Sequence, residues 1–486
     1  MDNRIRSKKL IKKVMSPKEA SQFIKDGMTV GTSGFTPAGY PKAVPLALAD
    51  RSNGGEKIKI NLITGASVGE ELDGELAKAG VIERRYPYQT NNDMRNGINS
   101  GDIKFSDIHL SHMPRWIKYG FFGNIDVAVI EAVAVNEDGS IVPSTSIGCS
   151  NALVEKADKV IIEINTSQPK ELEGIHDVYD IKNPPYTQPI PLTGVDQKIG
   201  VPYIKCPVDK IAAIVVTDIK DSTRSVAPID QDSKKMACLI VEFLVKESKE
   251  GRIPEKLLPL QSGVGSVANA ILGGLEETEF QNLEIYSEVL QDSVFDLMDA
   301  GKIKFASGTS LTISPERLEN FYENLHKYRE KIILRPEEIS NNPEIIRRLG
   351  VIAMNTAIEF DIYGNVNSTN IQGSRMMNGI GGSGDFARNA YLSIFMTKST
   401  AKGGDISSIV PFVKHVDHTE HDVHVVVTEQ GLADLRGLSP KERAEVIIEN
   451  CVHPKFKDKL RKYIESADKN CKYKHTPHNF EEAFKS

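Results

Sequence analysis

The sequence predicts an α/β protein made of two tandem, similar domains, each with an open, mostly parallel sheet flanked by helices. Short β-type runs alternate with helical patterns along most of the 486 residues, and this alternation is typical of a parallel sheet. The order of elements in the first half recurs in the second half, which indicates a duplicated domain. We place the domains at residues 1–225 and 226–486 and expect the functional site in the cleft between them.

The first half opens with a helix start signal and continues as strand, turn and helix. Ser16-Pro17-Lys18-Glu19 is a capping box with proline at the first helical position, and it predicts a helix that ends near Lys25. The run Met28–Phe35 predicts a strand that enters a glycine turn, and a helix over 41–51 follows. Further predicted strands cover residues 58–63, 125–130, 159–164 and 211–216.

The second half centres on the stretch 257–292. A predicted helix over 231–249 precedes it, as the helix that starts at Ser16 precedes the first strand. Within the stretch, an apolar run enters a Gly-x-Gly turn, a helix covers 266–275, and a second apolar run at 283–286 leads to Glu288. Because ligands bind at the carboxyl ends of strands in open α/β sheets, Glu288 stands where chemistry is expected.

Repeated glycines support the duplication. Gly139 and Gly148 recur as Gly364 and Gly373, each 225 positions later, and both pairs enclose a Ser-Thr pair. At a similar offset the turn at 63–66 falls near 285–288, and only the second copy carries an acid there. We therefore expect one site per chain.

Composition narrows the class of protein. Hydrophobic residues make up 40% and charged residues 26% of the chain, as in soluble globular proteins, and a net charge of -6 gives no basic field for nucleic acid. The apolar runs are shorter than a membrane span, and the basic N-terminus lacks the apolar core of a secretory signal. The five cysteines form no Cys-x-x-Cys pair, which favours reduced thiols and a cytoplasmic location.

Two glycine patterns suggest other chemistries. Gly65-Ala66-Ser67-Val68-Gly69 matches the nucleophile elbow of serine hydrolases, but only one clear strand precedes it, whereas such an elbow follows several. Gly263-x-Gly265-x-x-Ala268, with Glu288 some twenty residues later, fits a dinucleotide fingerprint. Gly379-x-Gly381-x-x-Gly384 is a second match without a convincing strand before it. Glycine-rich turns are common in doubly wound folds, so NAD binding stays an open alternative on pattern alone.

A histidine cluster offers a third alternative. His415, Asp417, His418, His421 and His424 lie within ten residues, and imidazoles with a carboxylate at short spacing could bind a metal. The cluster lies between two β-like runs, 409–413 and 423–427, so we expect the turn of a hairpin there.

Several motifs together resemble the acetyl-CoA hydrolase/transferase family of class I CoA-transferases, and most closely its succinyl-CoA:acetate CoA-transferase branch. The motifs span the chain from about residue 4 to 478 and are GTSGFTPAGYPKAVP, LITGASVGEELDGELAKAG, LPLQSGVGSVANA, YSEVLQD, NPEIIRRLG, MNGIGGSGDFAR and VTEQGLADLRGLSP. The resemblance implies CoA thioesters as substrates, no permanently bound cofactor, no metal, no NAD and a homodimer.

The resemblance also implies roles for single residues. Glu288 would attack the acyl-CoA thioester and later carry CoA as a glutamyl thioester, and Asn341 would lie near the acyl pocket. The backbone amides of Val264 and Gly382 would form the oxyanion hole. The expected CoA contacts are Gly263, Val264, Gly265, Ser266, Val267, Asn378, Gly382 and Lys402.

The resemblance leaves the exact reaction open. An acyl-CoA hydrolase on the same scaffold is the nearest alternative, followed by transferases for propionyl-, butyryl- or 4-hydroxybutyryl-CoA. The sequence departs from the family pattern at Val68, at Ser266, where close relatives have asparagine, and over 218–230. The contact of Ser266 with CoA is therefore the least supported of the expected roles, and the segment 218–230 receives none.

Overall fold

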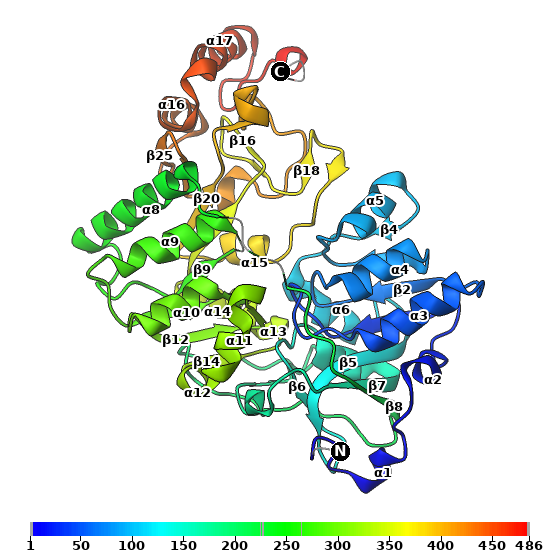
Figure 1. Cartoon of the computed structure of the whole chain (residues 1–486). Helices are drawn as coiled ribbons and strands as arrows, with labels where there is room; N and C mark the ends of the chain where they lie inside the picture. Colours follow the sequence, from blue (N-terminus) through cyan, green and yellow to red (C-terminus); the bar gives the residue numbers. More distant parts are fainter. Residues whose placement is uncertain (1–2, 224, 226–227, 264, 484–486) are drawn as a thin grey trace.

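The computed structural model describes residues 3–223, 225, 228–263 and 265–483, and it contains two large sheets, one from each half of the chain (Figure 1). The strand order of the first sheet is β4-β3-β2-β1-β5-β7-β8, with β6 paired to β5. Its neighbours are parallel except for β5 and β6. The strands are β1 (Thr29–Thr32), β2 (Ile60–Ile63), β3 (Ile82–Tyr86), β4 (Lys104–Phe105), β5 (Ile125–Val135), β6 (Ile141–Pro143), β7 (Ala157–Asn165) and β8 (Ile211–Thr217).

The second sheet repeats this order. It runs β14-β12-β10-β9-β15-β20-β24-β25 and is parallel except between β24 and β25. The first seven strands of the two sheets correspond in order: β4, β3, β2, β1, β5, β7 and β8 of the first sheet match β14, β12, β10, β9, β15, β20 and β24 of the second. The predicted pair of similar α/β units is thus confirmed, while the division at 225 and 226 stays a prediction. The strands are β9 (Leu260–Ser262), β10 (Leu283–Tyr286), β12 (Ile303–Gly308), β14 (Ile332–Leu334), β15 (Ile352–Thr356), β20 (Leu392–Met396), β24 (Val425–Thr428) and β25 (Gly431–Asp434).

Helices flank both sheets, and the last long ones lie at the far end of the second half (Figure 1). The helices of the first half are α1 (Lys8–Ile11), α2 (Pro17–Ser21), α3 (Ala43–Asn53), α4 (Glu75–Lys78), α5 (Asn92–Ser100), α6 (Met113–Tyr119) and α7 (Ser150–Lys156), with short turns η1 (Glu70–Gly74), η2 (Leu110–His112) and η3 (Lys170–Leu172). Those of the second half are α8 (Gln231–Lys249), α9 (Ser266–Glu276), α10 (Asp292–Asp299), α11 (Pro315–Glu323), α12 (Leu325–Tyr328), α13 (Glu337–Ser340), α14 (Pro343–Leu349), α15 (Ser383–Ala387), α16 (Pro440–Cys451), α17 (Pro454–Asn470) and α18 (Phe480–Ala483).

Local sequence signals predicted several element boundaries and missed others. The capping box of Ser16 and Glu19 is present, but the helix it starts ends at Ser21. The helix over 231–249 is confirmed. The predicted hairpin around 415–424 is wrong, because β23 (Ile409–Val410) pairs with β16 (Glu359–Asp361) and β24 pairs with β20 and β25. The intervening residues form a loop with one 3-10 turn, η5 (Glu420–Asp422).

Smaller strands complete the second half. They lie in loops that follow the main strands. They are β11 (Val289–Gln291), β13 (Ser310–Thr312), β17 (Val366–Asn367), β18 (Asn370–Ile371), β19 (Arg375–Met376), β21 (Thr400–Ala401) and β22 (Ile406–Ser407), with the turn η4 (Lys402–Gly404).

Residues from the end of the first half of the chain pack into the second half. Ile181, Ile190 and Leu192 are buried in one cluster with Tyr286 and Ile339 of the second half. This apolar surface is removed from water only when the halves are joined, so it stabilises their relative placement. Within the described residues, every helix is too short or too polar to span a bilayer.

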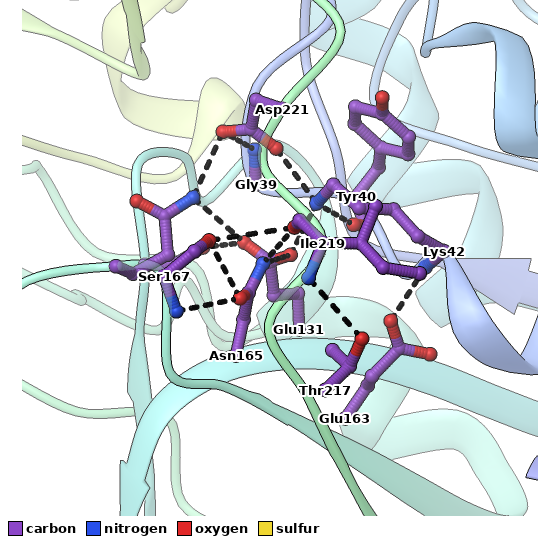
Figure 2. Close-up of polar contacts among 12 residues, drawn as sticks. Gly39, Tyr40, Lys42, Glu131, Glu163, Asn165, Ser167, Thr217, Ile219 and Asp221 are labelled. Atoms are coloured by element: carbon purple, nitrogen blue, oxygen red, sulfur yellow. Dashed lines mark hydrogen bonds and ion pairs between the residues drawn. The ribbon is translucent and has the colours of Figure 1, made fainter.

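Strand β5 carries a buried charge into the first sheet. Its apolar run is covered on both faces, as expected for a central parallel strand, but Glu131 interrupts it with 1% exposure. The Lys42 ammonium forms ion pairs with Glu131 and, at 2.7 Å, with Asp221 (Figure 2). Burial disfavours the charge on Lys42, but Asp221 and Glu131 outweigh it and hold the Lys42 pKa above its usual value.

The cluster of Lys42, Glu131 and Asp221 connects the loop before α3, strand β5 and the segment after β8. Asp221 also accepts hydrogen bonds from the Gly39 amide at 3.2 Å and the Thr145 hydroxyl at 2.9 Å. Next to it, Glu163 accepts from the first amides of α3 and so caps that helix from β7. The loop before α3 and the segment after β8 are therefore fixed to the sheet by buried ion pairs and by hydrogen bonds to buried carboxylates.

Lys42→Met is expected to destabilise the fold by about 3–5 kcal/mol, because it leaves two carboxylates buried without their cation. Chemical denaturation at pH 7.5 measures this difference. Lys104→Met is the matched control, since Lys104 pairs with Glu83 at the surface and such pairs contribute less than about 1 kcal/mol. Equal losses in the two variants would contradict the importance of the buried cluster.

Candidate active site

Glu288 follows the end of β10, a central strand of the second sheet, at its carboxyl edge. Its backbone carbonyl accepts hydrogen bonds from the amides of Thr309 at 2.8 Å and Ser310 at 3.2 Å, which fixes the chain where it leaves the strand. The side chain lines a cavity of about 210 Å³. The predicted position of Glu288 at a strand end is therefore confirmed.

A single amide holds the Glu288 carboxylate. Asn341, directly after α13, donates from Nδ2 to Glu288 Oε1 at 2.7 Å. Burial raises the pKa of Glu288 to about 7, and the hydrogen bond from Asn341 offsets part of this rise. The described lining of the cavity contains no lysine or arginine, so the carboxylate is held by a neutral donor rather than by an ion pair.

The backbone of Gly382 packs against the same carboxylate oxygen that accepts from Asn341. A Cβ on Gly382 would fall 1.8 Å from Glu288 Oε1 and 2.3 Å from Asn341 Nδ2, so only glycine fits there. The preceding Gly381 has φ 59, a left-handed conformation that favours glycine. The Gly382 amide lies at the cap of α15, outside the repeating hydrogen bonds of the helix. The Cα of Gly382 therefore lies against the Glu288 carboxylate and the Asn341 amide.

Apolar side chains from the first half form the opposite wall. Phe35, Ala66 and Leu110 are buried in a cluster with Val289, and Tyr88 packs against it. The Ser310 hydroxyl donates to the Phe35 carbonyl at 2.7 Å and so joins the wall to the second half. The cavity therefore exists only where the two halves meet, as the sequence predicted for the site.

The other predicted contacts divide into two groups. Gly263, Asn378 and Gly382 line the same cavity as Glu288. Three other predicted contacts do not line the cavity. Lys402 is exposed on the turn between β21 and β22. Ser266 is the first residue of α9, and Val267 packs against the largest hydrophobic core cluster. Gly265, at the N-cap of α9, does not line it either. Val264 lies outside the described residues.

One acceptor in the cavity lining is unpaired. Among the described residues, Asn378 Oδ1 is buried and has no hydrogen-bond partner. Such an atom in a polar cavity is expected to meet a donor from a bound molecule or water. The amide hydrogens of a ligand would satisfy it.

The alternatives raised by the sequence fare differently in the structure. The loop from β9 to α9 and the acid after β10 match the topology of a dinucleotide fingerprint. In that fingerprint the acid binds ribose hydroxyls, whereas here Glu288 accepts a hydrogen bond from Asn341 in a small cavity. Ser67 is buried behind the wall and does not line the cavity, as a nucleophile would have to. The elbow interpretation therefore has no geometric support among the described residues.

The histidine cluster does not converge. His415 pairs with Asp417 at 3.2 Å, His418 Nε2 lies 3.0 Å from the Ser383 hydroxyl, and His424 Nδ1 accepts from the Ser393 amide at 3.1 Å. In the described part of the chain, no three His, Cys, Asp or Glu side chains gather in a way that could hold a metal ion. The histidine side chains instead contact separate elements, with His418 against the start of α15 and His424 against β20.

Sequence reasoning missed the residues behind the Asn341 amide. Asp385 lies on α15, three positions after Gly382, and contacts both Asn341 and Ser111. Its place in a glycine-rich motif was a signal that could have drawn attention to it. Ser111 offered none, because its contact with Asp385 joins residues 274 positions apart.

Comparison with known proteins gives consistent matches over the whole chain. Residues 1–217 match the acetyl-CoA hydrolase/transferase N-terminal domain and residues 318–464 match the acetyl-CoA hydrolase/transferase C-terminal domain. The chain is 57% identical over 483 residues to a succinyl-CoA:acetate CoA-transferase of Clostridium kluyveri, covering 99% of this chain and 90% of that protein.

Other relatives carry different activities in their names. The chain is 47% identical over 502 residues to an acetyl-CoA hydrolase of Schizosaccharomyces pombe, covering 100% of this chain and 96% of the relative. It is 47% identical over 458 residues to a propanoyl-CoA:succinate CoA transferase of Escherichia coli, covering 93% of each. The crystal structure of RipA from Yersinia pestis has a similar fold, with a TM-score of 0.74 at 23% identity over 96% of this chain and 99% of that one.

Glu288→Gln is expected to raise the thermal midpoint at pH 8, because glutamine buries no charge. The folded-state pKa of Glu288, about 7, lies above the ordinary value of 4.5, so ionisation disfavours the native state. The advantage of glutamine should vanish near pH 4, grow as pH rises from 4.5 to 7, and stay constant above. Thermal melts across this range check it.

Glu284→Gln serves as the control for that series. Glu284 lies on the same strand and pairs with Lys304 at 2.8 Å near the surface. A pH-independent difference between Glu288→Gln and the wild-type protein would contradict the burial of charge at Glu288.

Proposed function

The chain belongs to the acetyl-CoA hydrolase/transferase family, and within it we propose that this enzyme moves CoA from succinyl-CoA to acetate, and in reverse, with Glu288 as the nucleophile. One observation carries the proposal. The Glu288 carboxylate stands at a strand end in a small cavity, where its Oε1 accepts from the Asn341 amide and lies against the Gly382 backbone. A carboxylate becomes a useful nucleophile when it is desolvated and faces fixed donors.

The first step forms an anhydride. A Glu288 oxygen attacks the thioester carbonyl of the acyl-CoA, the carbon–sulfur bond breaks, and CoA leaves as a thiolate. Negative charge develops on the acyl oxygen before the bond breaks. The resemblance assigns the Gly382 and Val264 amides to this oxyanion, and the position of Gly382 at the N-cap of α15, with its Cα against Glu288, supports that role for Gly382.

The second step transfers CoA to the enzyme. The thiolate attacks Cδ of Glu288, the bond from Cδ to the bridging oxygen breaks, and the donor acid leaves as its carboxylate. Negative charge now develops on the oxygen that Glu288 retains. Asn341 Nδ2 donates to Glu288 Oε1 at 2.7 Å, so the same hydrogen bond can stabilise this second oxyanion. Acetate then attacks the glutamyl thioester and reverses both steps to release acetyl-CoA.

The cavity suits this cycle because no step requires a proton. Each step exchanges a thiolate for a carboxylate, so the reaction needs donors for oxyanions rather than an acid or a base. The described lining provides hydroxyl, amide and backbone groups, and Glu288 is its one charged side chain. The apolar wall of Phe35, Ala66 and Leu110 also helps to keep water from the anhydride.

Substrate identity rests on the relatives and on cavity size. The volume of about 210 Å³ suits a short acyl group, and the 57% identical relative is named for succinyl-CoA and acetate. Asn378 Oδ1, buried without a partner, is available to an amide of the pantetheine arm. Gly263 supports the same contact from the cavity lining, and exposed Lys402 is free to meet a phosphate of CoA. A homodimer in the cytoplasm remains an expectation of the resemblance and the composition.

Acyl-CoA hydrolysis is the second candidate, because a relative 47% identical over its length is named an acetyl-CoA hydrolase. Water would then intercept the glutamyl intermediate on the same scaffold. Transfer to propionate, butyrate or 4-hydroxybutyrate differs only in the acyl group, and the propanoyl-CoA:succinate relative illustrates this variation.

Incubation with succinyl-CoA is expected to leave CoA attached to the peptide that carries Glu288. Trypsin cuts after Lys256 and Lys302 and has no site between them, so one peptide reports the adduct by mass. Glu288→Gln should abolish it, and Glu284→Gln on the same peptide should keep it. An adduct that persists in Glu288→Gln would assign the nucleophile to another residue.

Loss of the succinyl-CoA thioester is expected to depend on acetate. The transferase releases little free CoA without a carboxylate acceptor, because the walls of the cavity limit access of water to the intermediate. Initial rates with acetate, propionate, butyrate and no acceptor test this and rank the acids. A full rate of thioester loss without acceptor would favour the hydrolase.

A further inference from the structure

Asp385 joins the two halves of the chain directly behind the proposed nucleophile. It lies on α15 with 4% of its surface exposed. Its Oδ2 accepts from the Ser111 amide at 2.9 Å and its Oδ1 from the Ser111 hydroxyl at 2.6 Å. Ser111 belongs to the turn η2 of the first half, whose neighbour Leu110 is part of the cavity wall. The contact between Ser111 and Asp385 therefore holds the cavity wall of the first half against α15 and also fixes the position of the Asp385 carboxylate.

The same carboxylate faces the amide that holds Glu288. Asn341 Nδ2 lies 2.7 Å from Glu288 Oε1 and 3.4 Å from Asp385 Oδ2, and Asn341 Oδ1 accepts from the Ser340 hydroxyl at 2.8 Å. An amide nitrogen has two hydrogens, and here each has its own carboxylate oxygen. A flipped amide would place its oxygen against two carboxylates, so this environment selects one orientation.

The need for a second acceptor follows from the proposed reaction. When Glu288 carries an acyl group or CoA, it loses its negative charge and becomes a weaker acceptor for Asn341. The attraction that aims the amide at Glu288 is then weakest at the stage where the second oxyanion must form. Asp385 undergoes no covalent change in the cycle, so its attraction for the amide persists.

Resting on the function proposed above, we propose that Asp385 is a positioning residue: anchored by Ser111 of the other half, it keeps the Asn341 amide aimed at Glu288 through every covalent state of the cycle. The carboxylate acts through Asn341 and does not touch the reacting atoms. Because its anchor lies in the first half, the nucleophile is fully held only when the halves are docked.

Three titratable side chains face the Asp385 carboxylate: Glu288, Glu337 and His109. Glu288 faces it from the end of β10, and Glu337 faces it from α13, buried and with no hydrogen-bond partner for either carboxylate oxygen among the described residues. His109, before η2, places Nδ1 4.0 Å from Asp385 Oδ1, and burial lowers the pKa of that imidazole. Burial raises the pKa of Asp385 to about 7, the Ser111 contacts lower it, and the Glu288 charge raises it again.

Two carboxylates that share one amide repel each other when both are ionised. Removing the charge of Asp385 should therefore let Glu288 ionise at lower pH. This effect belongs to a residue that faces the nucleophile, and a generally structural residue would not produce it. It supplies the readout that distinguishes positioning from folding.

Asp385→Asn tests the proposal with the smallest change of shape. An amide can accept from the Ser111 N–H and donate to its hydroxyl, so docking is kept, but an amide can also donate to Asn341 and so no longer selects one orientation. We expect kcat to fall on the order of tenfold or more with KM for succinyl-CoA little changed. The acid limb of kcat/KM should move down by about half a pH unit or more.

A double-mutant cycle with Asn341→Ala tests whether Asp385 acts through Asn341. Asn341→Ala should reduce kcat by about 10²–10³, and adding Asp385→Asn to it should cost little more. Asp361→Asn is the matched control, because Asp361 is buried in the same half, bonded to Asn365 and away from the cavity lining. It should leave kcat and the acid limb in place.

The outcomes separate this proposal from the proposed function. An unchanged kcat, an unmoved acid limb, or full additivity with Asn341→Ala overturns the role of Asp385 while the CoA adduct on wild-type Glu288 stands. Absence of that adduct in the wild-type enzyme overturns the proposed function itself.

Discussion

The structure depends on holding a carboxylate out of water without giving it a cation. An ion pair would stabilise Glu288 but would also satisfy its charge and weaken it as a nucleophile. The protein instead provides a neutral donor, the Asn341 amide, at 2.7 Å, and leaves the pKa of Glu288 near 7. A neutral donor is effective only if it points the right way. The rest of the architecture can be understood as the means of aiming it.

Both halves of the duplicated fold contribute residues to the cavity that contains Glu288. The two sheets share one strand order, and the buried carboxylates near Lys42 have a cation that Glu288 does not have in the described lining of its cavity. In the first half the Lys42 ammonium forms ion pairs with both Glu131 and Asp221, and these contacts support the neighbouring loops. In the second half Glu288 stays uncompensated by any cation in the described lining. The first half contributes Ala66 and Phe35 to the wall of the cavity that contains Glu288.

Local signals in the sequence predicted a large part of this picture. Alternating strands and helices gave the fold class, the repeat gave two similar units, and the apolar run before Glu288 gave its place at a strand end. What sequence reasoning could not predict is long-range. The packing of Ile181 and Ile190 on the second half, and the contact of Ser111 with Asp385, join residues far apart that carry no periodic pattern. The hairpin at 415–424 was wrong because short apolar runs do not specify their partners.

The central claim is that a Glu288 oxygen forms a bond to the acyl group in every turnover. When acetate attacks the glutamyl thioester and CoA then takes the acetyl group, one acetate oxygen stays on Glu288. Turnover of succinyl-CoA with doubly ¹⁸O-labelled acetate, followed by tryptic digestion and mass analysis of peptide 257–302, measures that oxygen directly. The account predicts ¹⁸O in the Glu288 carboxyl group. An unlabelled Glu288 after many turnovers would contradict it.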